Sequence, residues 1–222
     1  MEMKLFFAPG ACSRVTMSAL EEIGVPFEAI PVNIHRGDQK KAAYKAINPK
    51  GKVPALAIGG RVLTENAAIL HYLHSRFPEA ALLPPVSSLE DAQAVLADLL
   101  WCSSTLHPLV RQIRNPARLT DGDTEALHDK GVAMFTELMT ETNDRLSRTG
   151  PWWSGQDWSI MDVYLFWCYD VAASGGYDLA AHQTLVGHRG AVRARESFQR
   201  ARAREMAAAE QLGLAFPPGF SL

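Results

Sequence analysis

The chain has 222 residues, of which 47% are hydrophobic and 21% charged, the composition of an ordinary globular protein. Its formal net charge of −2 gives no strong field for nucleic acid or for an anionic membrane, so neither is expected as a partner. Three cysteines without paired spacing favour reduced thiols over a disulfide framework. No apolar run approaches the roughly 18 residues of a membrane span or forms a signal sequence, so we expect a cytoplasmic chain.

Strand and helix signals alternate at the start of the chain. Residues 4–8 are a short apolar run that predicts a strand, and Pro9 and Gly10 end it. Residues 13–23 carry apolar side chains at helical spacing, and residues 27–32 predict a second strand. This order is a βαβ unit, which implies two parallel strands.

A hairpin is predicted next. Residues 53–58 and 61–64 have strand patterns and are joined only by Gly59–Gly60, a link typical of a tight hairpin. A helix is predicted over residues 65–76. The order β-α-β and then β-β-α is the thioredoxin-like arrangement, so we assign residues 1–80 to an α/β thioredoxin-like domain.

The strand signals stop after a proline-containing break, which we interpret as a linker over residues 81–88. Only helical patterns follow, and they predict an all-helical domain over residues 89–222. Pro108 lacks a backbone N–H and should bend the first of these helices. The predicted helices cover residues 89–113, 124–146, 159–173 and 191–212.

Cys12 is the first candidate for chemistry, because it lies just after the first strand at the predicted start of a helix. Unpaired backbone N–H groups and the helix dipole stabilise a thiolate at such a position; the alternative is a small residue in a tight turn. Val15 stands where a second cysteine would complete a dithiol pair, so a dithiol redox cycle is not expected. The neighbouring Ser13 either donates a hydrogen bond to a bound thiolate or caps the helix.

Two further segments have the character of a binding site. Pro54 opens the third strand, where a proline is commonly a turn or a cis bond. A cis-proline there would leave the backbone of Val53 free to pair with an extended peptide. Glu65 and Asn66 begin a helix straight after a strand, where free N–H groups would hold a carboxylate and Glu65 an ammonium; ordinary capping is the alternative.

Four segments carry a further signal: residues 7–13 (Phe-Ala-Pro-Gly-Ala-Cys-Ser), 48–56 (Asn-Pro-Lys-Gly-Lys-Val-Pro-Ala-Leu), 64–70 (Thr-Glu-Asn-Ala-Ala-Ile-Leu) and 158–166 (Trp-Ser-Ile-Met-Asp-Val-Tyr-Leu-Phe). In this order and spacing they resemble the glutathione S-transferases, and the first resembles the bacterial beta class in particular. In the fourth, Ser159-x-x-Asp162 before an apolar run is also a helix-capping pattern in its own right. The resemblance spans residues 3–170.

The resemblance implies a role for each matching residue. Cys12, with Ser13 beside it, would adjoin the sulfur of glutathione, and His107 on the first long helix of the helical domain would reach the same site. The pair Val53–Pro54 would bind the cysteinyl backbone, and Glu65–Asn66 the γ-glutamyl group, although serine is more usual than asparagine at the second of these positions.

The glycine end of glutathione is usually held by a basic or amide group in the loop after the second strand. Here that loop is residues 35–40. Gln39 and Lys52 are the candidates we carry forward, and the sequence leaves the choice of residue open.

As a whole, the resemblance implies a cytoplasmic, homodimeric glutathione transferase. It would conjugate the thiol of glutathione, its co-substrate, to small hydrophobic electrophiles in detoxification, without a metal. One alternative is a glutathione-dependent thiol reductase or thioether lyase that uses Cys12 as nucleophile. The other is a non-catalytic binding or interaction module with the same fold.

Several other residues have structural interpretations. Cys102 and Cys168 lie in apolar helical stretches and are expected in the core. The last predicted helix carries several arginines interleaved with Glu196 and Glu205, and we interpret it as a solvated face rather than a nucleic-acid patch.

Overall fold

The computed structural model describes residues 2–216 of the chain. No helix within these residues is long and apolar enough to cross a membrane. The contacts divide the chain into two compact units. The first contains the residues up to Leu82 together with the segment that begins at Glu196, and the second covers Leu83–Arg195.

The first unit is built on a mixed sheet of four strands in the order β2-β1-β3-β4. β1 pairs parallel with β2 and antiparallel with β3, which pairs antiparallel with β4. α1 connects the two parallel strands and α3 follows the hairpin, so the predicted thioredoxin-like arrangement is confirmed. The elements are β1 (Met3–Phe7), α1 (Ser13–Ile23), β2 (Glu28–Pro31), α2 (Ala42–Lys45), β3 (Ala55–Ile58), β4 (Arg61–Thr64) and α3 (Asn66–Arg76).

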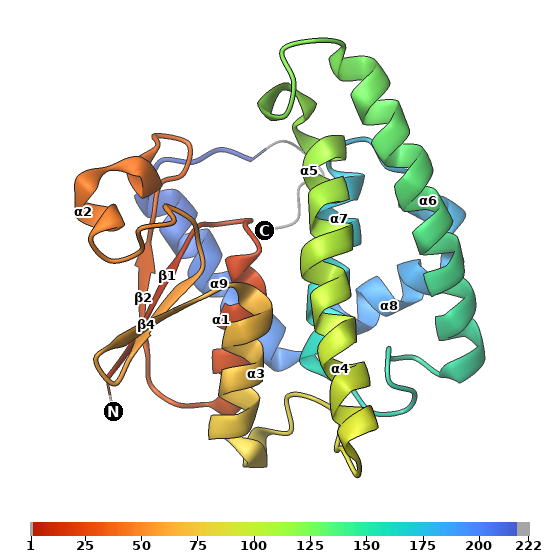
Figure 1. The fold of residues 1–222 in the computed structure, drawn as a ribbon, viewed down its shortest axis with the longest axis horizontal. Helices are drawn as coiled ribbons and strands as arrows, with labels where there is room; N and C mark the ends of the chain where they lie inside the picture. Colours follow the sequence, from red (N-terminus) through yellow and green to blue (C-terminus); the bar gives the residue numbers. More distant parts are fainter. Residues whose placement is uncertain (1, 217–222) are drawn as a thin grey trace. The chain divides into compact units, whose positions relative to one another are not determined.

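The side chains of β1 alternate between the two faces of the sheet and contribute to a hydrophobic core on each. Phe6 packs edge to face on Tyr44 of α2, with ring centroids 6.0 Å apart. Leu5 and Phe7 are buried and point to the opposite face, because successive side chains of a strand alternate. α1 and α3 cover that opposite face (Figure 1).

The last helix, α9 (Glu196–Gln211), packs along α1 and so belongs to the first unit. The sequence pattern predicted one helix over residues 191–212 in the helical domain, which joins α9 to the end of the preceding helix. The joined helix is wrong: α8 (Gln183–Ala194) ends before Arg195, whose backbone is extended with φ −69° and ψ 133°. The guanidinium of Arg195 lies 3.8 Å from the ring centre of Trp158, which holds the residue between the two helices.

The second unit is helical throughout its regular elements. Between α4 and α5 the chain makes a π-helical turn over Cys102–Leu106, which ends two residues before Pro108. The missing N–H of the proline is accommodated at this irregular turn, so the helix is interrupted where the bend was predicted. The other helices are α4 (Leu89–Trp101), α5 (His107–Arg114), α6 (Thr124–Thr149) and α7 (Ile160–Ala173).

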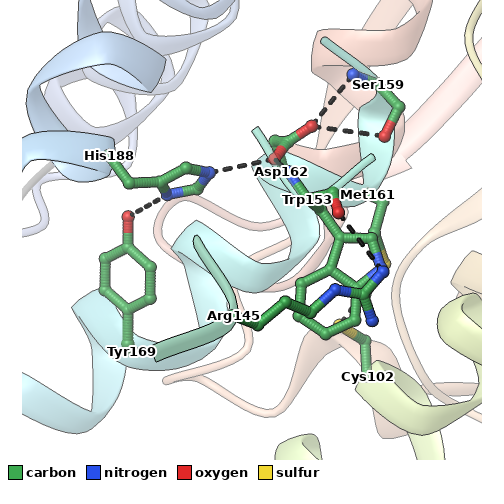
Figure 2. Close-up of polar contacts among 8 residues, drawn as sticks. All are labelled: Cys102, Arg145, Trp153, Ser159, Met161, Asp162, Tyr169 and His188. Carbon is green, nitrogen blue, oxygen red and sulfur yellow. Dashed lines mark hydrogen bonds and ion pairs between the residues drawn. The ribbon is translucent and has the colours of Figure 1, made fainter. Parts of the chain in front are cut away.

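A capping box begins α7, as predicted (Figure 2). Asp162 Oδ2 accepts hydrogen bonds from the backbone N–H of Ser159 at 2.9 Å and from its hydroxyl at 3.2 Å. Asp162 Oδ1 accepts the N–H of Trp153 at 2.7 Å and lies 3.0 Å from Nε2 of His188, whose Nδ1 is 2.8 Å from the Tyr169 hydroxyl. The carboxylate is fully buried, so one side chain organises α7, α8 and the preceding loop.

Trp153 extends this network. Its indole N–H donates to Asp98 of α4 at 2.7 Å, and its ring stacks on Trp101 at 5.3 Å. The guanidinium of Arg145 lies 3.7 Å from the centre of the same ring. Cys102 and Cys168 are also fully buried, which confirms that they are core residues.

Candidate thiol and glutathione site

The loop between β1 and α1 presents Cys12. Within it, the N–H of Ala11 donates to the carbonyl of Ala8 at 3.1 Å. Gly10 has a φ of 75°, a backbone conformation that residues with a Cβ rarely adopt, so glycine suits the turn. Cys12 then occupies the position immediately before α1, where the sequence placed it.

Ser13, the neighbour of Cys12, makes hydrogen bonds within this loop. Its buried hydroxyl accepts the N–H of Ala8 at 3.1 Å and donates to the carbonyl of Ala8 at 3.2 Å. A hydroxyl carries a single hydrogen, so this arrangement leaves none for a thiolate. Ser13 therefore closes the loop around Ala8 in this structure, and its hydrogen bond to a bound thiolate stays a prediction.

Cys12 and the Val53–Pro54 pair come together although they lie far apart in the sequence. The thiol Sγ is 3.7 Å from the carbonyl oxygen of Val53. The Val53–Pro54 peptide bond is cis, in agreement with the position of the proline at the start of the third strand. Only 9% of the surface of Cys12 is exposed. The contact with the Val53 carbonyl shows that its thiol faces the backbone of this pair.

Asn66 ties the beginnings of α1 and α3 together. Its Nδ2 donates to the carbonyl of Cys12 at 2.7 Å, and its Oδ1 accepts the hydroxyl of Thr16 at 2.7 Å. The residue is buried. The side chain therefore holds the backbone of Cys12 in place. Its contact with glutathione stays a prediction.

Glu65 has a backbone that is unusual for a residue with a side chain. Its φ is 68° and its ψ 120°, a region that costs on the order of 1–3 kcal/mol for a non-glycine residue. Its carboxylate lies 2.8 Å from Nζ of Lys50, and both side chains are more than half exposed. An exposed pair of this kind contributes little to stability, so Glu65 can exchange its partner for a ligand ammonium.

The segment before Val53 is fixed against the helical turn at residues 38–40. The hydroxyl of Tyr44 and Nδ2 of Asn48 both donate to the carbonyl of Lys52 at 2.7 Å. Burial raises the pKa of Tyr44, so its phenol stays a donor at neutral pH. A Cβ at Gly51 would lie 2.8 Å from the carbonyl oxygen of Gln39, so glycine permits this close approach and brings Gln39 and Lys52 into one neighbourhood.

His107, the third residue of the predicted catalytic set, lies in the second unit as the first residue of α5. Its ring meets Trp167 of α7 edge to face, with centroids 4.5 Å apart. The packing holds the imidazole against α7. Its role near the thiol stays a prediction.

Sequence reasoning missed two residues at this site, Glu205 and Arg14. Glu205 was interpreted as part of a solvated face, but it is fully buried. Its Oε1 accepts the N–H of Gly10 at 3.1 Å, and its Oε2 is 2.5 Å from Nε of Arg14. The sequence contained a signal for this contact, because Glu205 lies within an apolar stripe at helical spacing. An acidic side chain on a buried helix face requires a buried hydrogen-bond or ion-pair partner. The stripe consists of Phe198, Ala201, Ala208 and Ala209.

Residues 10–76 match the family profile described as Glutathione S-transferase, N-terminal domain. Glutathione S-transferase GstA from Escherichia coli O157:H7 is 33% identical over 179 residues, which are 76% of this chain and 84% of that protein. The chain belongs to the glutathione S-transferase family. Another similar protein, maleylacetoacetate isomerase from Pseudomonas aeruginosa, is 29% identical over 176 residues, 74% of this chain and 78% of that protein.

Solved structures of the family agree with this assignment. A bacterial beta class glutathione S-transferase from Sphingomonas chungbukensis has a TM-score of 0.79 and 30% identity, covering 91% of this chain and 98% of that one. A sphingomonad glutathione S-transferase complexed with glutathione has a TM-score of 0.80 and 29% identity, with the same coverage. The family and beta-class resemblance inferred from the sequence are thus confirmed.

Proposed function

We propose that this glutathione S-transferase family member conjugates the thiol of glutathione to small hydrophobic electrophiles. One observation carries the proposal: the Cys12 thiol, at the beginning of α1, lies 3.7 Å from the carbonyl of Val53 at the cis Val53–Pro54 bond. The similar sphingomonad structure complexed with glutathione supports glutathione as the ligand.

We assign each part of the tripeptide to a group in the first unit. The cysteinyl backbone pairs with Val53 as an added strand would. The γ-glutamyl ammonium binds Glu65, and its carboxylate meets the backbone N–H groups that begin α3. Gln39 or Lys52 binds the glycine carboxylate. This pose places the sulfur of glutathione beside Cys12.

The chemistry needs the thiolate of glutathione. A free thiol has a pKa of about 8.5, so little thiolate exists at neutral pH without stabilisation. The positive end of α1 stabilises the thiolate. The Cys12 thiol adds a hydrogen bond when its hydrogen turns from the carbonyl of Val53 to the bound sulfur. The thiol of glutathione loses its proton to solvent, and the sulfur forms a bond to carbon of the electrophile. In substitution the leaving group departs with the electrons of the broken bond; in addition to an activated alkene the resulting carbanion takes up a proton from water.

A panel of aryl halides and activated alkenes, assayed with glutathione, tests this function. We expect conjugation by the wild type and partial retention by Cys12→Ala, because glutathione supplies the nucleophile. Calorimetry checks binding independently. An absence of binding at millimolar glutathione would overturn the proposal and leave the non-catalytic binding module.

A second candidate is glutathione-dependent isomerisation, which the similarity to maleylacetoacetate isomerase over 74% of this chain favours. The same thiolate would add to a conjugated double bond and leave again after rotation. Turnover of a cis-configured dicarboxylic alkene without a stable conjugate would establish it in place of conjugation.

The remaining enzyme alternative uses Cys12 as the nucleophile in disulfide reduction or thioether cleavage. Val15 in place of a second cysteine disfavours a dithiol cycle. Mass spectrometry after incubation with oxidised glutathione tests it. We expect slow, partial loading of Cys12, and rapid complete loading together with loss of all conjugation in Cys12→Ala would favour the covalent mechanism.

The proposal also includes a homodimer in the reducing cytoplasm. α4 exposes Leu89, Leu96 and Leu100, which share one helical face and are exposed by 81%, 37% and 47%. An apolar stripe of this kind supports burial against a second copy of the chain. All three cysteines are free thiols, which supports a reducing compartment.

A further inference from the structure

The loop that carries Cys12 is anchored by buried hydrogen bonds from different parts of the first unit. Ser13 holds Ala8 within the loop, and Asn66 of α3 holds the carbonyl of Cys12. The remaining anchor is Glu205, whose carboxylate accepts the N–H of Gly10 at 3.1 Å. The two residues are 195 positions apart in the sequence. The catalytic loop is therefore attached to the last helix of the described structure.

The two carboxylate oxygens of Glu205 have separate tasks. Oε1 faces Gly10, and Oε2 faces Arg14, whose side chain is 1% exposed. Burial raises the pKa of Glu205, while Arg14 and the N–H of Gly10 act in the opposite direction and favour the ionised form. Arg14 thus places a positive charge beside the carboxylate that accepts the N–H of Gly10.

Stability alone is a weak explanation for this pair. Replacing a buried ion pair with apolar residues of similar volume is often neutral or stabilising. A hydrogen bond from Glu205 to the loop gives the pair another effect, because Gly10 adopts φ 75° and glycine has access to many other conformations. An acceptor fixed on α9 selects one of them.

We propose that Glu205 is a positioning residue, which sets the reactivity of the site by fixing Gly10 and hence Cys12 two residues later. The inference rests on the proposed function in one respect, that the Cys12 loop is where the thiol chemistry occurs. α9 is thereby a part of the active-site scaffold, although its sequence has no recognisable family motif.

Two double variants separate the hydrogen bond from the ion pair. Arg14→Met with Glu205→Gln removes both charges and keeps an oxygen acceptor for Gly10. Arg14→Met with Glu205→Met removes the charges and the acceptor, at similar side-chain volume. Any difference between the two reports the Gly10 hydrogen bond, because the electrostatic change is the same in both.

The readout is the rate of Cys12 alkylation by iodoacetamide across pH, mapped by mass spectrometry, with the fully buried Cys102 and Cys168 as internal references. We expect the alkylation rate of Cys12 in the Gln variant to stay within about threefold of wild type. In the Met variant this rate should differ from wild type by about tenfold, because the buried hydrogen bond to Gly10 is lost. This assay needs no glutathione, so it separates failure of this inference from failure of the proposed function.

Steady-state kinetics on the same variants adds a second readout. The Met variant should lower kcat for conjugation more than it changes KM for glutathione, because a displaced loop misplaces the reacting sulfur. Arg200→Gln is the matched control: it breaks an ion pair with Glu21 between the same two helices and leaves the loop untouched. Its alkylation profile should match that of the wild type.

Hydrogen exchange of the wild-type protein tests the contact even if a variant does not fold. The Gly10 amide should be protected to the same extent as the amides of α9, since it is released only when α9 detaches. Exchange of Gly10 at the rate of an open loop would overturn the inference. Equal alkylation profiles of the folded Gln and Met variants would overturn it as well.

Discussion

Glu65 combines a left-handed backbone with an exposed carboxylate at the beginning of α3. If it binds the γ-glutamyl ammonium, Glu65→Gln should raise KM for glutathione by about tenfold or more, the loss of one charge-assisted hydrogen bond, with a smaller effect on kcat. Lys50→Met is the control, because it removes the protein partner of Glu65 and leaves the carboxylate in place. An unchanged KM in Glu65→Gln would show that the γ-glutamyl assignment is wrong.

Asn66 is a residue whose side chain both donates and accepts. Asn66→Asp keeps the acceptor for Thr16 but turns the donor to the Cys12 carbonyl into a second acceptor. We expect a loss of about 1–3 kcal/mol in the free energy of unfolding, measured by denaturant titration. Thr16→Val removes only the other hydrogen bond and should cost less. Equal stability of Asn66→Asp and wild type would contradict the role of Asn66 in holding the backbone of Cys12.

At the scale of elements, the capping box decides where α7 begins. Ser159→Ala should lower the free energy of unfolding by about 0.5–2 kcal/mol. Asp162→Ala should cost more, because the same carboxylate also accepts the N–H of Trp153 and faces His188. Both variants should melt at lower temperature while the folded fraction keeps its specific activity. Full stability with lost activity would contradict this structural role.

His128 of α6 contacts the backbone just after the end of α7, and the protonation of its ring should affect this contact. Nε2 of His128 lies 3.0 Å from the carbonyl of Gly175, and its Nδ1 lies 3.0 Å from Asp129. Both contacts favour the protonated ring, with the Asp129 hydrogen bond the larger cause, and they raise the pKa of His128 above its ordinary value of 6.5.

Because the folded-state pKa of His128 is raised, its stabilisation is complete below pH 6.5 and is lost as the pH rises through the higher folded-state value. Thermal melts across this window should show a loss of stability with rising pH that His128→Asn diminishes. The same slope in the variant would show that other groups cause it.

At the scale of the whole molecule, the exposed stripe of α4 bears on assembly. Leu96→Glu and Leu100→Glu each place a charge on a face that a second copy would bury, and buried unpaired charge is strongly unfavourable. We expect both variants to be monomers by analytical ultracentrifugation where the wild type is a dimer. Exposed Leu119 lies outside α4, and Leu119→Glu serves as the control. A monomeric wild type would refute the homodimer.

Local patterns were sufficient for most of the fold. The helix over residues 13–23 and the hairpin strand over residues 61–64 were predicted with the bounds that the structure has. Periodicity and glycine turns act over a few residues, so they can be read directly. The same holds for the capping box at Ser159, whose partners are three residues apart.

The sequence by itself therefore determined the thioredoxin-like order of elements, the place of Cys12 before α1 and the segments that resemble the glutathione S-transferases. Only the tertiary structure decided that the Ser13 hydroxyl closes its own loop, that Asn66 holds Cys12, and that the buried Glu205 holds Gly10. These contacts depend on which helices lie side by side. Polar side chains look alike in a sequence whether water or a distant backbone group satisfies them, and packing alone decides between the two.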